Sequence, residues 1–276
     1  VYEQPALARQ DGLWMLNNKR WGRIGGVNGH GYNLTIGKDF LSDEHGYYGL
    51  LFDYGSNTVS GAAGSGEYDS YSLGLYAGNK NKPGSITGFV SYGLQANKGT
   101  AYLPVLGQTA ESGYDSKTLG IGVEYAYDLD YGKPEELWHV SPYARINFTH
   151  YRQKAFREHG AGVFDRSFGS YSDNYAEGEL GLSFDRSEGA GGYGLRLGYK
   201  RILTGERQLM EVCFAEDECG SLLPVRSWGE GRNHFVAAAY VRHDFSRKWS
   251  AGGSLSGDWS NGGREIGARL DLAYHF

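Results

Sequence analysis

The stretch EIGARLDLAYHF, residues 265–276, decides the fold. Its apolar residues fall on every second position, and the residues between them are charged, small or histidine. A period of two over this length indicates a strand with one apolar and one polar face. Strands of soluble sandwiches run to about 5–6 residues, whereas a tilted strand that crosses a bilayer needs roughly 9–11. The stretch therefore predicts a membrane-crossing strand.

The same alternation recurs along the chain and predicts a row of long strands. The mean hydropathy of −0.51 hides this pattern because each strand averages an apolar face with a polar one. Long connections, near 57–69, 97–113, 154–170 and 205–231, alternate with short ones, as in outer-membrane barrels. The expected strands are 13–24, 32–40, 46–56, 69–79, 85–97, 115–129, 138–152, 172–186, 192–203, 232–245, 249–259 and 264–276.

These strands predict an all-β chain, a single transmembrane antiparallel β-barrel of twelve strands of the outer-membrane type. Aromatic residues near strand ends, such as Trp249 and Trp259, match the girdles of such barrels. A soluble all-β sandwich is the alternative. The first strand, 13–24, alternates poorly, so a helix or a segment partly in the lumen is an alternative there.

Composition and motifs exclude other classes. The 27 basic and 32 acidic residues are scattered, with no basic stripe for nucleic acid. The chain has no run of about 18 apolar residues, so it predicts no transmembrane helix. It also lacks the G-x-S-x-G and H-E-x-x-H motifs and a phosphate-binding loop, which would indicate an enzyme. The sequence therefore predicts no catalytic residue, metal or cofactor. A hydrolase site at the barrel rim is a weak alternative, resting on His150, His159, Asp165 and Ser167.

Several motifs, in their order along the chain, resemble the translocator domain of autotransporters, the type V secretion systems. The segment 68–78 is similar to the fourth-strand pattern of that family, and 141–146 resembles its E-P-Y-A-R-L element, with Ser141 in place of a glutamate. The segment 176–182 resembles R-G-E-L-G-L, again with an altered charge at Glu177. Residues 12–14 match an opening G-x-W, and 274–276 resemble the terminal signal of the family.

The resemblance implies an outer-membrane translocator of a Gram-negative-type bacterium that anchors and helps to export an N-terminal passenger. Residues 1–12 would be the end of the passenger or a linker in the lumen, with a disordered terminus as the alternative, and 13–276 the barrel. The implied partners are outer-membrane lipid, the barrel-assembly machinery and the passenger, with the chain as a monomer. A free-standing porin-like channel is the alternative function.

Two sets of strand residues follow from the alternation. The apolar row of the last strand is expected to serve as the membrane-assembly signal: Ala268, Leu270, Leu272, Tyr274 and Phe276. The polar faces are expected to line the lumen with charges: Glu124, Arg145, Glu177, Glu179, Arg196, Lys200, Arg242, Asp244, Arg269 and Asp271. A solvated wall of ion pairs is the favoured interpretation, and a track for a translocating segment is the functional one.

Two residue pairs remain. Asn17 and Asn18 resemble the junction at which some autotransporters cut themselves, although strand or turn residues are the favoured interpretation. Cys213 and Cys219 are expected to form a disulfide, because they lie in the longest predicted outer loop and the envelope is oxidising. A metal site would need more ligands nearby.

Overall fold

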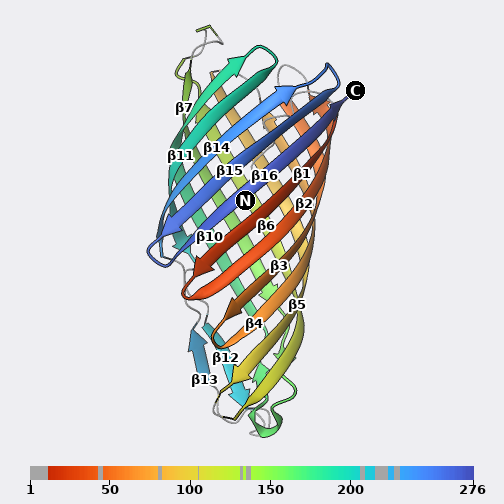
Figure 1. The fold of residues 1–276 in the computed structure, drawn as a ribbon, viewed down its shortest axis with the longest axis vertical. Coiled ribbons are helices and arrows are strands. Elements are labelled where there is room, and N and C mark those ends of the chain that lie inside the picture. Colours follow the sequence, from red (N-terminus) through yellow and green to blue (C-terminus); the bar gives the residue numbers. More distant parts are fainter. Residues whose placement is uncertain are drawn as a thin grey trace.

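The computed structural model describes residues 12–42, 46–79, 83–104, 106–130, 133–134, 138–205, 209–214, 223–226 and 231–276. They form a closed antiparallel barrel, in the order β1-β16-β15-β14-β11-β10-β7-β6-β5-β4-β3-β2 (Figure 1). The predicted twelve-stranded barrel is confirmed. The barrel strands are β1 Gly12–Ile24, β2 Val27–Ser42, β3 Gly46–Gly61, β4 Gly64–Asn79, β5 Gly84–Leu103, β6 Gln108–Tyr127, β7 His139–Gln153, β10 Tyr171–Glu188, β11 Gly191–Thr204, β14 Asn233–Asp244, β15 Trp249–Ser260 and β16 Gly263–His275.

The first strand is regular, so the helical alternative for 13–24 is wrong. β1 pairs residue by residue with β16 on one side and β2 on the other, which closes the barrel. Its alternation looks poor because Trp14 and Leu16 face inward and are buried, whereas Asn17 and Lys19 face outward. No helix in the described ranges is long and apolar enough to cross a membrane.

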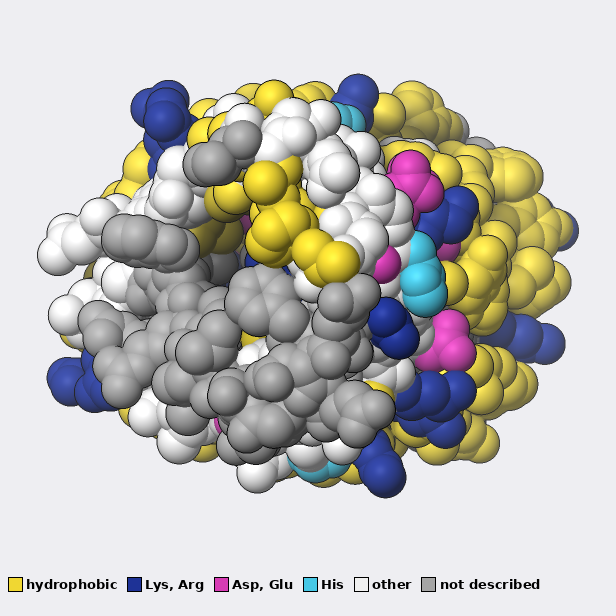
Figure 2. All heavy atoms as spheres, turned by 90° about the horizontal axis from the view of Figure 1, so that it is seen from below, with side chains coloured by type: hydrophobic (Ala, Val, Ile, Leu, Met, Phe, Trp, Pro, Cys, Tyr) yellow, Lys and Arg dark blue, Asp and Glu magenta, His cyan; other side chains and the backbone are white. Residues whose placement is uncertain are grey.

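The outer surface is apolar between two aromatic belts. Leu270 and Leu180 are 71% and 65% exposed, as expected of side chains that lipid surrounds. At the end with short turns, rings pack in pairs such as Trp249–Tyr274, with centroids 4.9 Å apart. Toward the end with long loops, Tyr54 packs against Tyr71 at 5.2 Å. Figure 2 looks onto the long-loop end and shows the yellow hydrophobic flank beside a rim of charged side chains.

The short turns mark the periplasmic end, because outer-membrane barrels turn tightly there.

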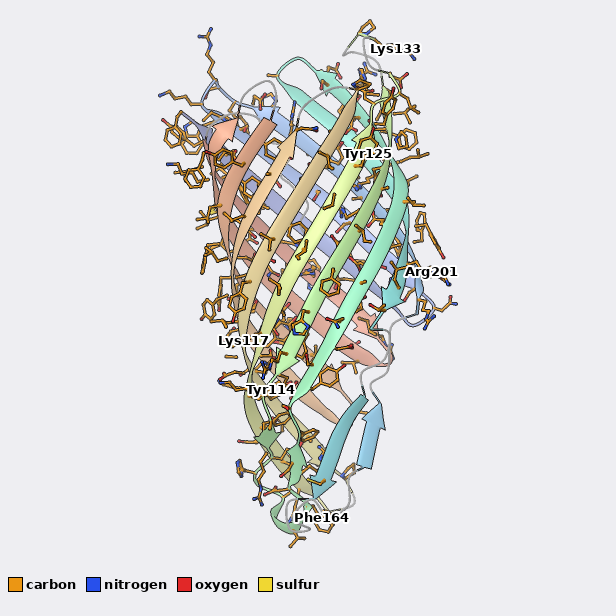
Figure 3. All side chains as sticks on the ribbon, turned by 180° about the vertical axis from the view of Figure 1, so that it is seen from behind. Tyr114, Lys117, Tyr125, Lys133, Phe164 and Arg201 are labelled. Carbon is orange, nitrogen blue, oxygen red and sulfur yellow. The ribbon has the colours of Figure 1, made fainter. Side chains whose placement is uncertain are left out.

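In the connection after β6, at the same end, the Lys133 ammonium and the N–H of Val140, 3.0 Å away, bind the Asp130 carboxylate. These donors hold the pKa of Asp130 below its usual range, Lys133 contributing most. In Figure 3, Lys133 and Tyr125 lie toward this end, and Tyr114 and Phe164 toward the other.

The strands extend further outward than predicted. Much of the loop expected at 57–69 belongs to β3 and β4, and most of 97–113 belongs to β5 and β6, which are both 20 residues long. These extensions are rich in Gly, Ser and polar residues because they lie beyond the lipid, where alternation is not required. Their backbone ladders continue, with Thr100 opposite Glu111.

Parts of the other two long loops form a second sheet rather than irregular structure. Its order is β13-β12-β9-β8, with β8 Phe156–Arg157, β9 Arg166–Phe168, β12 Leu209–Phe214 and β13 Leu223–Arg226; η1, a short 3-10 helix, spans Gly162–Phe164. Phe156 stacks between Tyr114 and Phe168, with centroids 4.2 and 4.4 Å away. The stack joins this sheet to the outer end of β6.

Candidate functional site

The lumen is the candidate functional site, and a cluster of three charges dominates one part of its wall. Glu124 on β6 faces Arg145 on the neighbouring β7, with Nε donating at 2.7 Å. Arg196 on β11 reaches the same carboxylate, with Nη2 donating at 2.6 Å. One half-buried carboxylate thus faces two guanidinium groups, which leaves the cluster with a net positive charge.

Arg196 can reach Glu124 because glycines leave room on the intervening strands. Its guanidinium lies 3.5 Å from the ring centre of Tyr143, in cation–π geometry. The Tyr143 ring lies over Gly181 and Gly198, where an added Cβ would come within 2.4 and 2.5 Å of the hydroxyl. The Tyr143 hydroxyl donates to Glu179 Oε1 at 2.7 Å. Glycine on the wall therefore decides where the charged side chains can lie.

A second network continues around the wall toward β15. Asn147 donates to Glu177 at 2.9 Å, and the Lys200 ammonium lies 3.9 Å from Glu177. Lys200 also binds Asp258, which accepts from His234 Nδ1 at 2.6 Å. Hydrogen bonds and ion pairs therefore link side chains of five strands, β7, β10, β11, β14 and β15, as expected of a solvated lumen wall.

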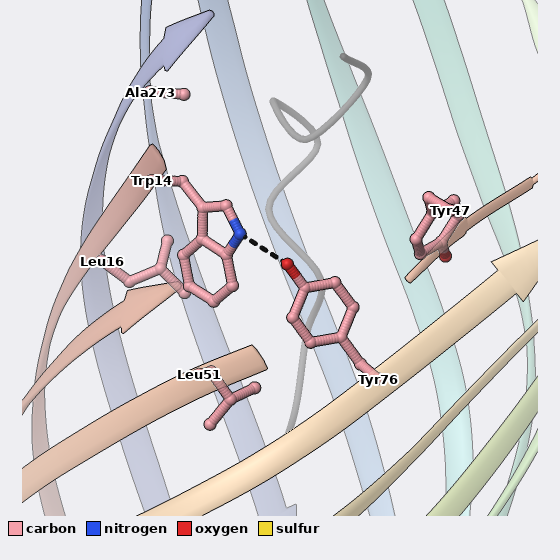
Figure 4. Close-up of a cluster of buried hydrophobic side chains, with 6 residues drawn as sticks. All are labelled: Trp14, Leu16, Tyr47, Leu51, Tyr76 and Ala273. Atoms are coloured by element: carbon pink, nitrogen blue, oxygen red, sulfur yellow. Dashed lines mark hydrogen bonds between the residues drawn. The ribbon is translucent and has the colours of Figure 1, made fainter. Parts of the chain in front are cut away.

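The opposite part of the wall carries a buried aromatic cluster that the sequence analysis missed. Trp14 Nε1 donates to the Tyr76 hydroxyl at 2.9 Å (Figure 4). The same hydroxyl binds Asp39. Leu16, Leu51, Tyr47 and Ala273 belong to the same buried cluster. The sequence held one signal for this cluster: the first strand has apolar residues on a face that is otherwise polar, which is why its alternation looks poor.

Two cavities of about 270 and 280 Å³ lie between the described side chains of the lumen. Both are lined by Arg145, Arg196 and Arg269, so guanidinium groups border the place where the cavities meet. Glu265, Asp258 and Asp53 line the first cavity only. The two cavities are therefore adjacent, and the lining that they share includes three arginines.

Most predicted lumen residues lie on the inner face. Arg269 Nε donates to Asp271 at 2.8 Å on β16, and Arg242 faces inward on β14. Asp244 is exposed at the periplasmic end of β14, outside these networks. The predicted assembly-signal residues on β16 and Phe276 form one outward row, of which Leu270 and Phe276 are 71% and 68% exposed. Their recognition by an assembly factor stays a prediction.

Asn17 and Asn18 lie within β1, where backbone ladders to β16 and β2 flank them. Asn17 faces outward, and Asn18 lines the first cavity. A cut between them would break a wall strand of the barrel, so this placement favours the interpretation as strand residues. Residues 1–11, the expected linker, lie outside the described residues.

Cys213 is buried on β12 and is disulfide-bonded. Its expected partner, Cys219, lies outside the described residues, so the pairing stays a prediction. The suggested rim residues have structural partners instead: His150 contacts Asn174 at 2.9 Å, and Asp165 accepts from the N–H of Ala161 at 2.8 Å. In the described part of the chain, no hydrogen bond joins any two of His150, His159, Asp165 and Ser167.

No metal or cofactor site emerges from the described ranges. No group of three or more His, Cys, Asp or Glu side chains there is placed to hold a metal ion. What the lumen can do chemically is bind and orient a polar segment or hydrated ions through fixed charges.

Comparison with known proteins identifies the family. The family model described as the autotransporter β-domain matches residues 13–256. The translocator domain of NalP from Neisseria meningitidis is similar in structure, with a TM-score of 0.82, 16% identity, and coverage of 98% of this chain and 90% of that one. No curated protein matches the chain by sequence.

Two further solved structures share the fold. The β-domain of the Bordetella autotransporter BrkA gives a TM-score of 0.70 at 15% identity, covering 97% of this chain and all 100% of that one. The transport unit of AIDA-I from Escherichia coli gives 0.65 at 12% identity, covering 100% and 93%. At these identities the structural likeness shows the fold, and the family rests on the match to the family model.

Proposed function

The chain belongs to the autotransporter β-domain family, and on this premise we propose that its lumen conducts a passenger attached before Gly12. The chain is an outer-membrane translocator domain. In the proposed role, the barrel anchors the passenger in the outer membrane and offers it a polar path to the cell surface. This role is transport and anchoring, without catalysis.

The position of Gly12 carries the proposal. Gly12 pairs with His275, so β1 enters the wall at the periplasmic end, beside the last residues of the chain. A segment joined to Gly12 starts on the inner side of the membrane and must cross it to reach the surface. The outer wall is apolar, whereas the lumen presents paired charges and hydroxyl groups, so the lumen is the path of lower free energy.

The partners follow from the same surfaces. Lipid covers the apolar band between the aromatic belts, and the outward row that ends at Phe276 serves the barrel-assembly machinery as its signal. A single chain closes the barrel through the β1–β16 ladder and leaves no wall edge open. We therefore expect the domain to act as a monomer.

The experiment places a bulky residue in the lumen of the full chain, with an epitope-tagged passenger fused before Val1. Ala238 faces inward on β14 and lines both cavities, whereas its neighbour Ala239 faces outward. Ala238→Trp should lower the amount of protease-accessible passenger on intact cells, and the matched Ala239→Trp should leave it unchanged. Resistance of the barrel to SDS shows in both cases that it has folded.

Equal surface display by both folded variants would contradict passage through the lumen. If Ala238→Trp does not fold, Ser254→Trp supplies the same test from β15, since Ser254 also lines both cavities. Loss of display by the outward variant alone would point to a route along the outer wall instead.

A further inference from the structure

The outward face of four neighbouring strands carries basic side chains at its outer end and no acidic ones. On β15, β16, β1 and β2, the outward positions at that end include Arg23, His30 and Arg264, and Lys19 lies further toward the middle of the span, opposite Ala268; all four are exposed. Among the described outward positions of these strands there is no Asp or Glu. The patch, which we call the seam patch, lies where the first and last strands of the barrel meet.

Two of these cations are placed directly against each other. Arg23 is opposite Arg264 in the antiparallel ladder of β1 and β16. Directly opposed side chains have Cβ atoms about 4.5–5.5 Å apart, and like charges there destabilise a sheet. In the described part of the chain, no hydrogen bond or ion pair to a protein group is found for the side chain of either arginine.

The inner face of the same two strands behaves differently. Arg20, which follows Lys19 on β1 and faces the lumen, lies 3.8 Å from Glu265 and donates to Asn33 at 3.0 Å. Charges that face the lumen therefore find partners within the protein. The outward pair faces only the membrane, so any counter-charge for it has to come from outside the chain.

The height of the seam patch matches the headgroups of the outer leaflet. Arg264 lies twelve residues before Phe276, which ends the row at the periplasmic end. At about 3.3 Å per residue and a tilt near 40°, this separation spans roughly 30 Å along the membrane normal, a little more than the apolar band of about 25 Å. The aromatic rings Trp21 and Trp259 flank the patch, with Trp259 opposite Arg264 in the ladder and the Lys19 ammonium 5.2 Å from the Trp21 ring centre.

We propose that the seam patch binds a phosphate group of a phosphorylated glycolipid, of the lipid A type, in the outer leaflet. Arginine pairs match a phosphate because each guanidinium can donate two parallel hydrogen bonds. The neighbouring indole rings offer faces to the sugar, and the apolar row below them offers contact to the acyl chains. The bound lipid neutralises the opposed arginines and stabilises the pairing of β1 with β16, which closes the barrel. The proposal depends on the outer-membrane location but not on passenger export.

Native mass spectrometry of the purified chain in detergent tests the proposal. The probes are bisphosphorylated lipid A, the same lipid without its phosphates, and phosphatidylglycerol. Arg23→Gln/Arg264→Gln removes the opposed pair. The control Lys38→Gln/Lys248→Gln removes the same charge near the aromatic rings of the periplasmic end, beside Phe276 and Tyr274.

We expect the unaltered chain to retain bisphosphorylated lipid A in preference to the other two lipids. The arginine double variant should weaken that binding roughly thirtyfold, from the usual contribution of a basic residue to anionic lipid binding, and the lysine control should not. Unchanged binding by the folded arginine variant would overturn the proposal. So would equal retention of the phosphate-free lipid or of phosphatidylglycerol by the unaltered chain, a comparison that needs no variant to fold.

Discussion

Arginine at Leu270 is the sharpest test of which face of each strand meets lipid. Leu270 is the most exposed large apolar side chain described, at 71%. It lies six residues from Phe276 and six from Arg264, so it sits close to the middle of the membrane span. We expect Leu270→Arg to lower the free energy of unfolding by about 2–4 kcal/mol, the cost of a basic residue at the midplane of a barrel.

Two control variants separate the effect of depth in the membrane from the effect of which strand face carries the charge. Ile266→Arg makes the same change on the same outward row nearer the outer belt, where the cost should fall toward about 0–1 kcal/mol. Ser256→Arg puts the charge into the lumen, beside the first cavity and opposite the uncharged Gly267 and Ala238. Gly267 is a poor lumen control although it faces inward, because a Cβ there would lie 2.7 Å from Ser256 Oγ. Crowding and charge would both contribute at that position.

The measurement is a urea titration of the barrel refolded into lipid vesicles, followed by tryptophan fluorescence and by SDS-resistant mobility. The expected order of cost is Leu270→Arg first, then Ile266→Arg and Ser256→Arg. Equal costs at Leu270 and Ser256 would refute the assignment of the two faces. Equal costs at Leu270 and Ile266 would refute the depth derived from the register.

Three further predictions test the lumen and the assembly signal. Gly181→Ala should lower the free energy of unfolding by about 1–3 kcal/mol in the same titration, because its Cβ would lie 2.3 Å from a backbone oxygen and 2.4 Å from the Tyr143 hydroxyl. Gly178→Ala is the control, because the nearest atom to its Cβ is 3.8 Å away. Equal costs of the two substitutions would count against the packing argument. Arg196→Gln removes a cation that borders both cavities, so the reversal potential in planar bilayers should shift toward cation selectivity, and an unshifted potential would place the ion path elsewhere. Deletion of Phe276 should lower the fraction of SDS-resistant barrel in the outer membrane, and normal insertion would show that the terminal residue is dispensable.

The limits of sequence reasoning are clearest at the outer end of the barrel. Alternation predicts a strand only where lipid covers one face, so the polar outer parts of β5 and β6, residues 98–103 and 108–114, were expected to be loops. Their backbone hydrogen bonds depend on the neighbouring strand and leave no period in the residues. The second sheet, in which Phe156 stacks on Phe168, was hidden for the same reason.

The sequence by itself determined the barrel, its number of strands and the two faces of most strands. Most strands turn an apolar side chain toward lipid at every second position, so their two faces can be recognised in the sequence, whereas β1, with Asn17 and Lys19 facing outward, departs from this pattern. Only the tertiary structure decided which charges meet, because Glu124 and Arg196 are 72 residues apart and are joined by the curvature of the wall. It also placed Arg23 against Arg264, since the contact between the first and last strands exists only once the barrel has closed.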